Sequence, residues 1–408
     1  MEKQLIPQLR FPEFQDLWSF DIVKNRAKKL KVGFVGTCEP FYTDKESGIL
    51  LIRTGNLKGV DIVLDDVKYV TSNFHQKNVK SQIYPDDLIL ARHGGKGEIC
   101  LVPKKFPTAN CLNIVILRVD NSVNSKFFQL IYGSTSIQKQ IIAVTAGSTQ
   151  TVINTKEIGK LKFKFPTLPE QQKIASFLTD VDEKITKLTK KKKLLEQYKK
   201  GVMQKIFSQE LRFKDDEGNA FPEWEEKKLG LIGSIISGLT YSPNDINENG
   251  VLVLRSSNVK KRLISLNDNV FVNVEKGKYN PVELNDILIC VRNGSKRLIG
   301  KNAIIKEEHI GLAFGAFMTV YRSNYNRFLF HFFDSQHYKK EVHKNLGATI
   351  NSINGGDLKK FKVPFPCEEE QTKIANFLSD IDLKIKALGA KIENSKAFKK
   401  GLLQQMFV

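Results

Sequence analysis

The segment EQQKIASFL at residues 170–178 returns as EQTKIANFL at residues 370–378. From 170 to 185, eleven of the sixteen residues are identical to those found 200 positions later. The match continues without a gap, pairing 147–207 with 347–407. Similarity at a fixed spacing indicates a duplicated structural unit. The sequence therefore predicts one architecture that is built twice within the 408 residues.

Shorter pieces extend the repeat into the rest of the chain. Between these pieces the two copies differ in sequence and slightly in spacing, so the middle of each copy was free to diverge. The matching pieces are LRF at 9–11 and 211–213, FPEF at 11–14 and FPEW at 221–224, IRTGNL at 52–57 and LRSSNV at 254–259, and DDLILARHG at 86–94 and DILICVRNG at 286–294.

Each copy ends in a segment with helical periodicity, in which apolar residues recur every seven positions. A second apolar set follows four residues behind the first. A heptad sustained over this length predicts a narrow apolar seam and a coiled coil, whereas the alternative, a buried amphipathic helix, has a wider apolar stripe. The predicted seam residues are Ile174, Leu178, Val181, Ile185, Leu188, Leu195, Val202 and Ile206 in the first copy and Ile374, Leu378, Ile381, Ile385, Leu388, Ile392, Leu402 and Met406 in the second.

Polar residues occupy some seam positions. Lys199 and Lys399 interrupt the heptad at equivalent places. Lys192 in the first copy and Ser395 in the second also occupy heptad positions, but not equivalent ones. A polar residue in a seam can fix the register of two helices, and a lysine can also extend its amine out to water. We expect one of these two roles for Lys199 and Lys399.

The segments before the helices, about 20–165 and 225–360, contain short β-rich runs broken by Gly, Asn and Asp. Such runs are typical of globular domains with strands and functional loops. We therefore predict an α+β fold with two globular α/β-type domains, two long helices that form an antiparallel coiled coil between them, and an internal pseudo-twofold repeat. The predicted boundaries are 1–165 and 211–362 for the globular domains and 166–210 and 363–408 for the helical spacers.

The charge balance points to nucleic acid. Sixty-four Lys and Arg against 44 Asp and Glu give a formal net charge of +20. A positive field of this size favours a polyanionic partner. No run of about 20 apolar residues could span a membrane, and the first residues lack the apolar core of a signal peptide. We therefore expect a cytoplasmic protein that binds DNA and no membrane.

Motifs for chemistry are missing from the sequence. The five cysteines are scattered without a C-x-x-C pair, which argues against disulfides and zinc and predicts small buried side chains. The glycine-rich stretch at 94–97 lacks the spacing of a phosphate-binding loop, and the six histidines show no metal-ligand spacing. No Asn-Pro-Pro-aromatic tetrapeptide is present to suit an adenine methyltransferase. We therefore predict no catalytic residue and no metal site in this chain.

Polar loops repeated in both copies are the candidate DNA contacts. Arg pairs with guanine and Asn with adenine in the major groove, whereas Lys mostly contacts phosphate. A solvated turn with incidental charge is the alternative for each loop. The candidates are Arg92, His93 and Lys96 with Arg292, Asn293, Lys296 and Arg297; Arg53, Thr54 and Asn56 with Arg255, Ser256 and Asn258; and Tyr42 and Tyr241 in the loops at 37–43 and 238–242.

The first helical segment is also rich in lysine. Residues 183–205 contain nine Lys and two Glu. A run of this kind is usually a solvated helix face. Contact with DNA phosphates or with an acidic partner is the alternative.

At this point the sequence resembles a known family. FPTLPEQQKI at 165–174, followed by a helix and by a second copy, is similar to the repeated signature of type I restriction-modification specificity subunits. GSTQ at 147–150, DDLILAR at 86–92 and FPEW at 221–224 fit the same pattern, so the resemblance covers essentially the whole chain. One departure is Cys-Glu-Glu at 367–369, where the first copy has Thr-Leu-Pro, and we expect it to alter the entry into the helix and not the role of the helix.

The resemblance implies a bacterial protein that catalyses nothing itself. Two target recognition domains would each recognise one half of a bipartite asymmetric DNA site, and the helix pair would set the gap and bind two methyltransferase subunits. Two restriction-translocase subunits would complete the complex. S-adenosylmethionine, ATP and Mg would be bound by these partners and none by this chain.

Two other functions stay open. One is a self-contained DNA methyltransferase or nuclease, which S-adenosylmethionine binding by the isolated chain would support. The other is a coiled-coil architectural protein that bridges two identical DNA sites, which a palindromic preferred site would support.

Overall fold

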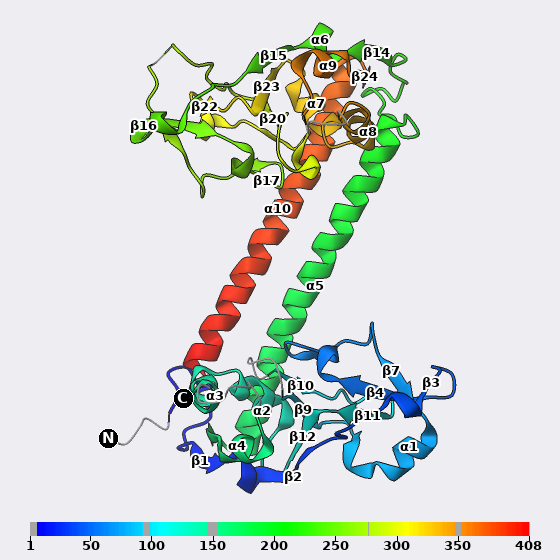
Figure 1. Cartoon of the computed structure of the whole chain (residues 1–408), viewed down its shortest axis with the longest axis vertical. Coiled ribbons are helices and arrows are strands. Elements are labelled where there is room, and N and C mark those ends of the chain that lie inside the picture. Colours follow the sequence, from blue (N-terminus) through cyan, green and yellow to red (C-terminus); the bar gives the residue numbers. More distant parts are fainter. Residues whose placement is uncertain (1–5, 93–97, 146–152, 276, 347–351, 408) are drawn as a thin grey trace. The chain divides into compact units, whose positions relative to one another are not determined.

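The computed structural model describes residues 6–92, 98–145, 153–275, 277–346 and 352–407. The chain forms two compact units: unit 1 contains 1–189 with 390–408, and unit 2 contains 190–389. Two long helices, α5 (Leu168–Phe207) and α10 (Glu368–Gln405), each begin in one unit and end in the other (Figure 1). Each unit therefore includes a globular part and half of each helix.

Unit 1 is built around an antiparallel four-stranded sheet. Its order is β10 (Ile99–Leu101), β9 (Leu88–Ala91), β12 (Ile114–Val119) and β2 (Ala27–Val32). A second sheet has the order β3 (Tyr42–Thr43), β7 (Lys68–Val70), β4 (Ile49–Arg53), β11 (Ala109–Leu112) and β8 (Gln82–Ile83). Two small pairs, β1 (Ser19–Ile22) with β13 (Lys162–Phe165) and β5 (Leu57–Lys58) with β6 (Asp61–Ile62), and helices α1 (Ser72–Lys77), α2 (Ser125–Tyr132), α3 (Thr135–Thr145) and α4 (Thr155–Lys160) complete the unit.

Unit 2 repeats this plan. Its four-stranded sheet has the order β15 (Ser234–Ser237), β23 (Met318–Arg322), β20 (Ile287–Cys290) and β21 (Asn302–Ile304), and its second sheet the order β19 (Phe271–Val272), β16 (Ile246–Leu254) and β22 (Ala313–Phe314). The small pairs are β14 (Glu225–Lys228) with β24 (Lys362–Phe365) and β17 (Val259–Lys260) with β18 (Leu263–Ile264). The helices are α6 (Leu229–Ile232), α7 (Asn326–Phe332), α8 (Gln336–Lys344) and α9 (Gly355–Lys360). The predicted duplication of one α+β architecture is confirmed.

An inner strand of each four-stranded sheet, β9 or β20, is buried on both faces. In β9, Leu88 and Leu90 join the core beneath the helices, while Ile89 faces the core shared with the second sheet. In β20, Ile287 joins the core beneath the helices of unit 2, and Leu288 faces the core shared with the second sheet. Alternate residues of a strand point to opposite faces, so a strand between two layers must be apolar throughout. This explains the unbroken apolar runs LILA and ILIC.

A buried carboxylate in the first turn of each long helix binds the segment that precedes the globular part of the same unit. Glu170 is fully buried in α5 and accepts hydrogen bonds from Arg10 Nε and Nη2, both at 2.8 Å, and from Trp18 Nε1 at 3.3 Å. The identical residue of α10, Glu370, is held by Arg212 and Trp224. A buried charge is tolerated only when it is paired. The repeated LRF and EQ motifs are thus parts of one contact.

The departure at 367–369 does not change the entry into the helix, so our expectation was wrong. Helices α5 and α10 begin at equivalent positions, 168 and 368. In each, the backbone N–H of the first glutamine, Gln171 or Gln371, donates to the residue four positions earlier at 3.0 Å. Its side chain donates to a proline carbonyl, Pro166 or Pro366. Because these acceptors are backbone atoms, the change of side chains leaves the turn intact.

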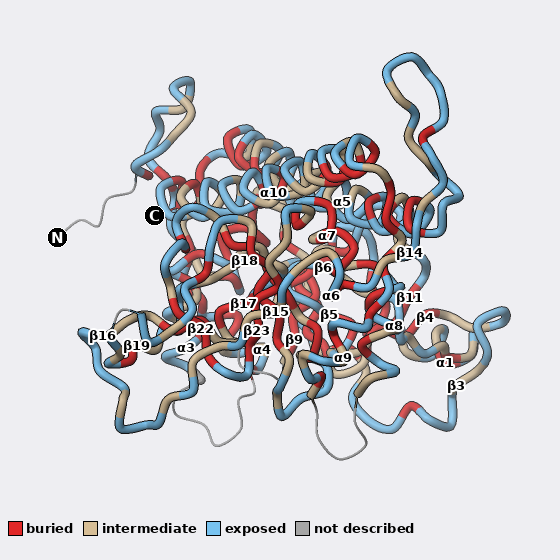
Figure 2. The backbone as a smooth tube through the Cα atoms, turned by 90° about the horizontal axis from the view of Figure 1, so that it is seen from above, coloured by how far each residue is buried: buried red, intermediate tan, exposed pale blue. Residues whose placement is uncertain are grey.

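Predicted seam residues of the two helices share a core within each unit. In unit 1, Ile174 and Leu178 of α5 share a core with Leu402 of α10. In unit 2, Ile374 and Leu378 of α10 share a core with Ile206 of α5. The start of one helix therefore packs against the end of the other, which is an antiparallel pairing. Both helices carry buried as well as exposed residues (Figure 2).

The two seam lysines form ion pairs across the helix pair. Lys199 Nζ lies 2.6 and 2.7 Å from the carboxylate oxygens of Asp382 in unit 2. Lys399 Nζ lies 2.5 Å from Asp182 Oδ1 in unit 1. Both pairs join the same two positions of the repeat. A charged pair inside an apolar seam penalises any shifted alignment, so these lysines fix the register.

The two ends of the described chain meet in unit 1. The backbone N–H of Leu9 donates to the carbonyl of Gln405 at 3.0 Å, and the ring of Phe407 packs against Trp18. In unit 2 the equivalent bond runs from Leu211 to Lys205 at 3.1 Å, where three intervening residues continue the chain past the end of α5. The same contact is made between residues far apart in the sequence in unit 1 and across a short turn in unit 2.

Two further expectations concern the whole chain. All five cysteines are free, and four of them are buried, as predicted for small apolar residues; Cys367 is partly exposed. Within the described residues, no helix combines the length and apolar character needed to cross a membrane.

We predict that Glu370→Ala lowers the free energy of unfolding by about 3 kcal/mol, because it leaves the Arg212 guanidinium without its buried partner. Urea denaturation measures the loss. The matched control is Glu369→Ala, since that carboxylate is exposed in the same helical turn and should leave the midpoint within error. Equal midpoints for the two variants would contradict the anchoring role.

Candidate nucleic-acid interface

The turn that follows β4 in unit 1 is held by a buried asparagine. Asn56 Oδ1 accepts from the backbone N–H of Arg53 at 2.9 Å, and Asn56 Nδ2 donates to the carbonyls of Val63 and Asp66, both at 3.1 Å. In unit 2, Asn258 makes the same bonds. Both asparagines are buried, and their amide donors are already used. The geometry therefore argues against base contact by Asn56 and Asn258, and for a turn-stabilising role.

The arginine of each turn stays partly exposed. Arg53 Nη2 donates to the carboxylate of Asp66 at 3.3 Å, and Arg255 Nη2 donates to Asp268 at 3.1 Å. Both carboxylates are largely exposed, and ion pairs of this kind contribute little stability. Each guanidinium is thus oriented by a partner that it can leave for a phosphate or a base. Thr54 and Ser256 begin the turns and are half-buried.

The loop after β20 gathers the predicted cations of unit 2. Arg292, Lys296 and Arg297 are exposed, and the latter two lie in a short 3-10 helix at Lys296–Leu298. Asn293 Nδ2 donates to Ser256 Oγ at 3.0 Å. The structure therefore brings the two predicted polar loops of unit 2 together on one surface.

The corresponding loop of unit 1 is only partly described. Arg92 follows β9, as predicted, and its carbonyl accepts from the backbone N–H of Ile153 at 3.1 Å. Its side chain is half-buried, and Arg92 Nε has no hydrogen-bond acceptor among the described residues. His93 and Lys96 lie outside the described residues.

The two predicted tyrosines are packed and not free in loops. Tyr42 begins β3 and contacts a small core with Phe34 and Leu51, and burial raises the pKa of its phenol. Tyr241 packs in the same manner against Val253 in unit 2. Both rings are half-buried, so a structural role explains them better than DNA contact.

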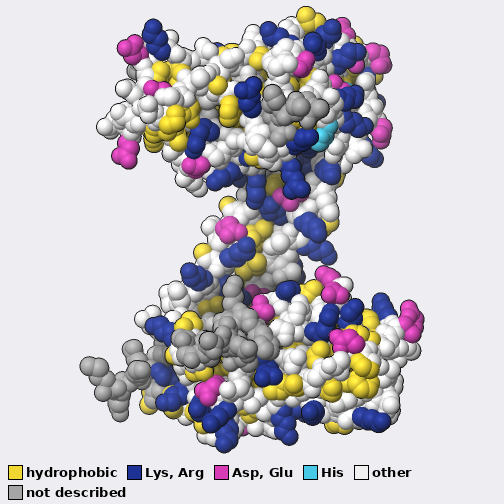
Figure 3. Space-filling view, in the orientation of Figure 1, with side chains coloured by type: hydrophobic (Ala, Val, Ile, Leu, Met, Phe, Trp, Pro, Cys, Tyr) yellow, Lys and Arg dark blue, Asp and Glu magenta, His cyan; other side chains and the backbone are white. Residues whose placement is uncertain are grey.

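The lysine-rich face of α5 is solvated, which is the simpler of the two interpretations. Lys190, Lys191 and Lys193 are exposed, whereas Lys192 is half-buried and forms an ion pair with Glu196. Lys and Arg side chains are also spread over the surfaces of both units (Figure 3).

Sequence reasoning missed a buried aspartate that positions each basic loop. Asp87 is fully buried just before β9 and accepts from Arg118 Nε at 2.6 Å and Nη2 at 2.9 Å. Asp286 before β20 is held by Arg322 at 2.9 and 2.7 Å. These bidentate pairs tie the strand that precedes the loop to its neighbour, β12 or β23. The aspartates lie in a repeated motif, but the arginines lie in divergent sequence that gave no signal.

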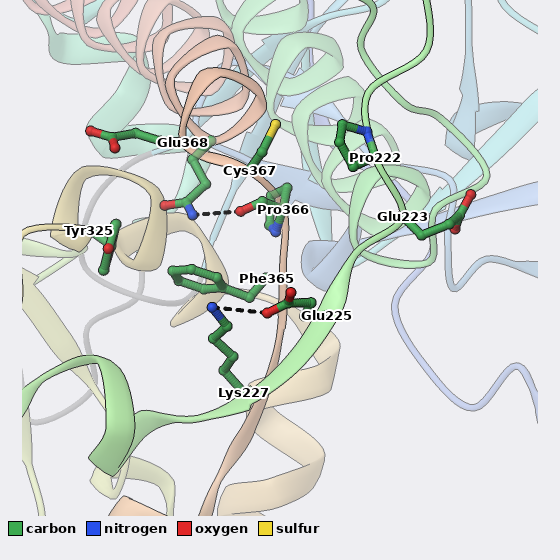
Figure 4. A pocket seen from close by; sticks show the side chains of 10 residues that line it. Pro222, Glu223, Glu225, Lys227, Tyr325, Phe365, Pro366, Cys367 and Glu368 are labelled. Carbon is green, nitrogen blue, oxygen red and sulfur yellow. Dashed lines mark hydrogen bonds and ion pairs between the residues drawn. The ribbon is translucent and has the colours of Figure 1, made fainter.

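The pocket at the entry of α10 does not suit DNA. A pocket of about 250 Å³ lies at the entry of α10, where Glu223 and Glu368 contribute negative charge and Lys227 is paired with Glu225 at 3.0 Å (Figure 4). Negative charge here disfavours phosphate binding. Among the described residues, His, Cys, Asp and Glu side chains form no group of three that could hold a metal ion.

The model of the type I restriction modification DNA specificity domain matches residues 52–197 and 222–395, which together cover well over half of the chain. The chain belongs to this specificity family. A specificity subunit of the type I restriction enzyme MjaVIII, from Methanocaldococcus jannaschii, is 30% identical over 310 residues, covering 73% of this chain and 72% of that protein. The EcoKI specificity subunit of Escherichia coli is 27% identical over 186 residues, covering 43% of this chain and 38% of that protein.

Solved structures agree with the specificity-family fold. The type I restriction-modification S subunit from M. genitalium has a TM-score of 0.61 at 17% identity, covering 99% of both chains. A chain from a study of complex assembly and conformational transition of the type I R-M system has a TM-score of 0.57 at 18% identity, covering 95% of this chain and 96% of that one. At these identities the likeness concerns the fold alone.

We predict that two residues of one turn in this specificity-family protein affect different properties, one the stability and the other DNA binding. Asn258→Ala should lower the free energy of unfolding by about 1–3 kcal/mol, because buried backbone groups lose their partners. Arg255→Ala should change it by less than about 0.5 kcal/mol, because the side chain is partly exposed, and should weaken DNA binding instead. Urea denaturation and DNA titration separate the two effects. A stable Asn258→Ala protein that no longer discriminates DNA sequences would overturn the turn-stabilising role.

Proposed function

We propose that this chain is the DNA-recognition subunit of a type I restriction-modification complex and catalyses no reaction itself. Each unit recognises one half of a bipartite asymmetric site in duplex DNA. The observation that carries the proposal is a basic surface at the same place in each unit. Arg53 and Arg255 occupy equivalent turns, and Arg92 and Arg292 lie in the loops that follow the equivalent strands β9 and β20. The turns that hold these loops are the same in both units, while the loop sequences differ. A shared framework with different loop sequences is what two domains need in order to recognise two different DNA sequences.

The chemistry belongs to partner chains. Two methyltransferase subunits bind S-adenosylmethionine and methylate adenine, and two restriction-translocase subunits use ATP and Mg to move and cut DNA. The helix pair offers the docking surface, because exposed apolar side chains such as Leu194 and Tyr198 lie on α5. Family membership supports these assignments.

We predict that the purified chain alone neither methylates nor cuts DNA. Adenine methylation should appear when a cognate methyltransferase subunit is added, and should saturate at about two per chain. Tritium transfer from labelled S-adenosylmethionine measures it, and long-read sequencing then gives the methylated motif. Turnover by the lone chain would favour a self-contained enzyme, and a palindromic motif would favour an architectural bridge between identical sites.

We also propose that the helix pair sets the gap between the half-sites. Four residues inserted between Leu188 and Leu195 lengthen α5 by about 6 Å, since a helix rises about 1.5 Å per residue. Base pairs are spaced by about 3.4 Å, so the mapped gap should grow by about one or two base pairs. Four residues approximate one helical turn, and the seam therefore survives as a local stutter.

The matched control inserts two residues at the same place. They rotate the following seam by about 200° and expose its apolar side, so assembly should fail. Unchanged half-sites with a longer gap support the helix-set spacing. A fully active four-residue variant with the original gap would show that the helices only bind partners.

A further inference from the structure

Unit 2 exposes one aromatic ring among its basic loops. Phe317 lies in the turn between β22 and β23, and 58% of its surface is exposed. Its carbonyl accepts hydrogen bonds from the backbone N–H groups of Val291 at 3.0 Å and Arg292 at 3.1 Å. The backbone of Phe317 therefore supports the loop after β20, while its ring remains in solvent.

One cation lies over this ring, and the loop that carries the cation is tied to a neighbouring turn. The guanidinium carbon of Arg292 lies 5.7 Å from the ring centroid. Asn293 is tied to Ser256 by the 3.0 Å hydrogen bond described above, and Lys301 Nζ donates to the Ser256 carbonyl at 3.2 Å. We call Ser256, Arg292, Asn293 and Phe317 the Phe317 cluster. It joins two loops and one turn into a single surface with donors, an acceptor and an apolar face.

The equivalent turn of unit 1 is one residue shorter. The backbone N–H of Asn113 donates to the carbonyl of Phe34, and Ala316 makes the same bond to Leu239 in unit 2. Strand β12 begins directly after Asn113, whereas Phe317 stands between Ala316 and the first residue of β23. Phe317 is therefore an additional residue of unit 2 without a counterpart in unit 1. A purely structural turn has no need of an additional exposed ring, whereas two domains that recognise different sequences need different exposed residues.

We propose that Phe317 contacts the methyl group of a thymine in the half-site recognised by unit 2, with Arg292 held beside it to bind the neighbouring base or phosphate. This inference rests on the proposed function. An aromatic ring suits the thymine methyl in the major groove, where Arg is also the commonest base contact. The adjacent cations Lys296 and Arg297 favour DNA over an apolar protein partner as the occupant.

The test uses the chain assembled with its methyltransferase subunits. Affinity is measured for a duplex with the mapped site and for a scrambled duplex, over a range of salt. Phe317→Ala should weaken binding to the mapped site about tenfold and leave the scrambled duplex unchanged. The slope against salt should stay the same, because no phosphate contact is lost. Leu231→Ala removes another exposed apolar side chain of unit 2 and should change neither affinity.

Replacing thymine by uracil removes only the methyl group and needs no protein variant. In the half-site of unit 2, one such replacement should weaken binding by the parent protein and not by Phe317→Ala. In the half-site of unit 1, any effect of uracil should be the same for both proteins. Phe317→Asn, which replaces the apolar ring by a polar side chain, should behave like Phe317→Ala.

The outcomes separate this inference from the proposed function. If the parent complex does not distinguish the mapped from the scrambled duplex, the proposed function fails. If it does, and Phe317→Ala discriminates equally well or loses affinity equally for both duplexes, only the role of Phe317 is overturned. The absence of a uracil effect in the half-site of unit 2 would overturn the thymine contact.

Discussion

The buried carboxylate at the start of each long helix is the constraint on which the two units depend. Glu170 and Glu370 have no access to water, so their charge requires the arginine and tryptophan that come from the beginning of the same unit. That requirement brings a segment from some 150 residues away onto the first turn of the helix. The globular part is thereby closed around the helix, and the helix leaves it in a fixed direction.

The periodic features of this fold could be predicted from the sequence, because periodicity follows from local geometry. The heptads of 174–206 and 374–406 and the apolar strands before Arg92 and Arg292 are examples. The partners of buried charges could not be predicted. Arg118 pairs with an aspartate 31 residues away, a pairing that only the antiparallel neighbours β9 and β12 bring about.

The candidate interface shows a different limit of sequence reasoning. In the sequence, an Arg-x-x-Asn segment fits base recognition and a capped turn equally well. Only the burial of Asn56 and Asn258 distinguishes these two roles. Tyr42 was ambiguous for the same reason. Phe317 gave no signal, because single phenylalanines in β-rich sequence usually belong to the core. The buried residues that hold the turns, Asn56 and Asn258, thus repeat between the units, whereas the exposed ring of Phe317 is found in unit 2 alone.

The hydrogen bond from Leu9 to Gln405 in unit 1 has its counterpart in the bond from Leu211 to Lys205 in unit 2. In unit 2 a short covalent turn joins the two residues, whereas in unit 1 they are far apart in the sequence. The contact between the start of a globular part and the end of a long helix therefore does not depend on a covalent link at that place. A circularly permuted variant, opened between Lys205 and Leu211 and linked between Gln405 and Leu9, would keep the same set of contacts in a different linear order.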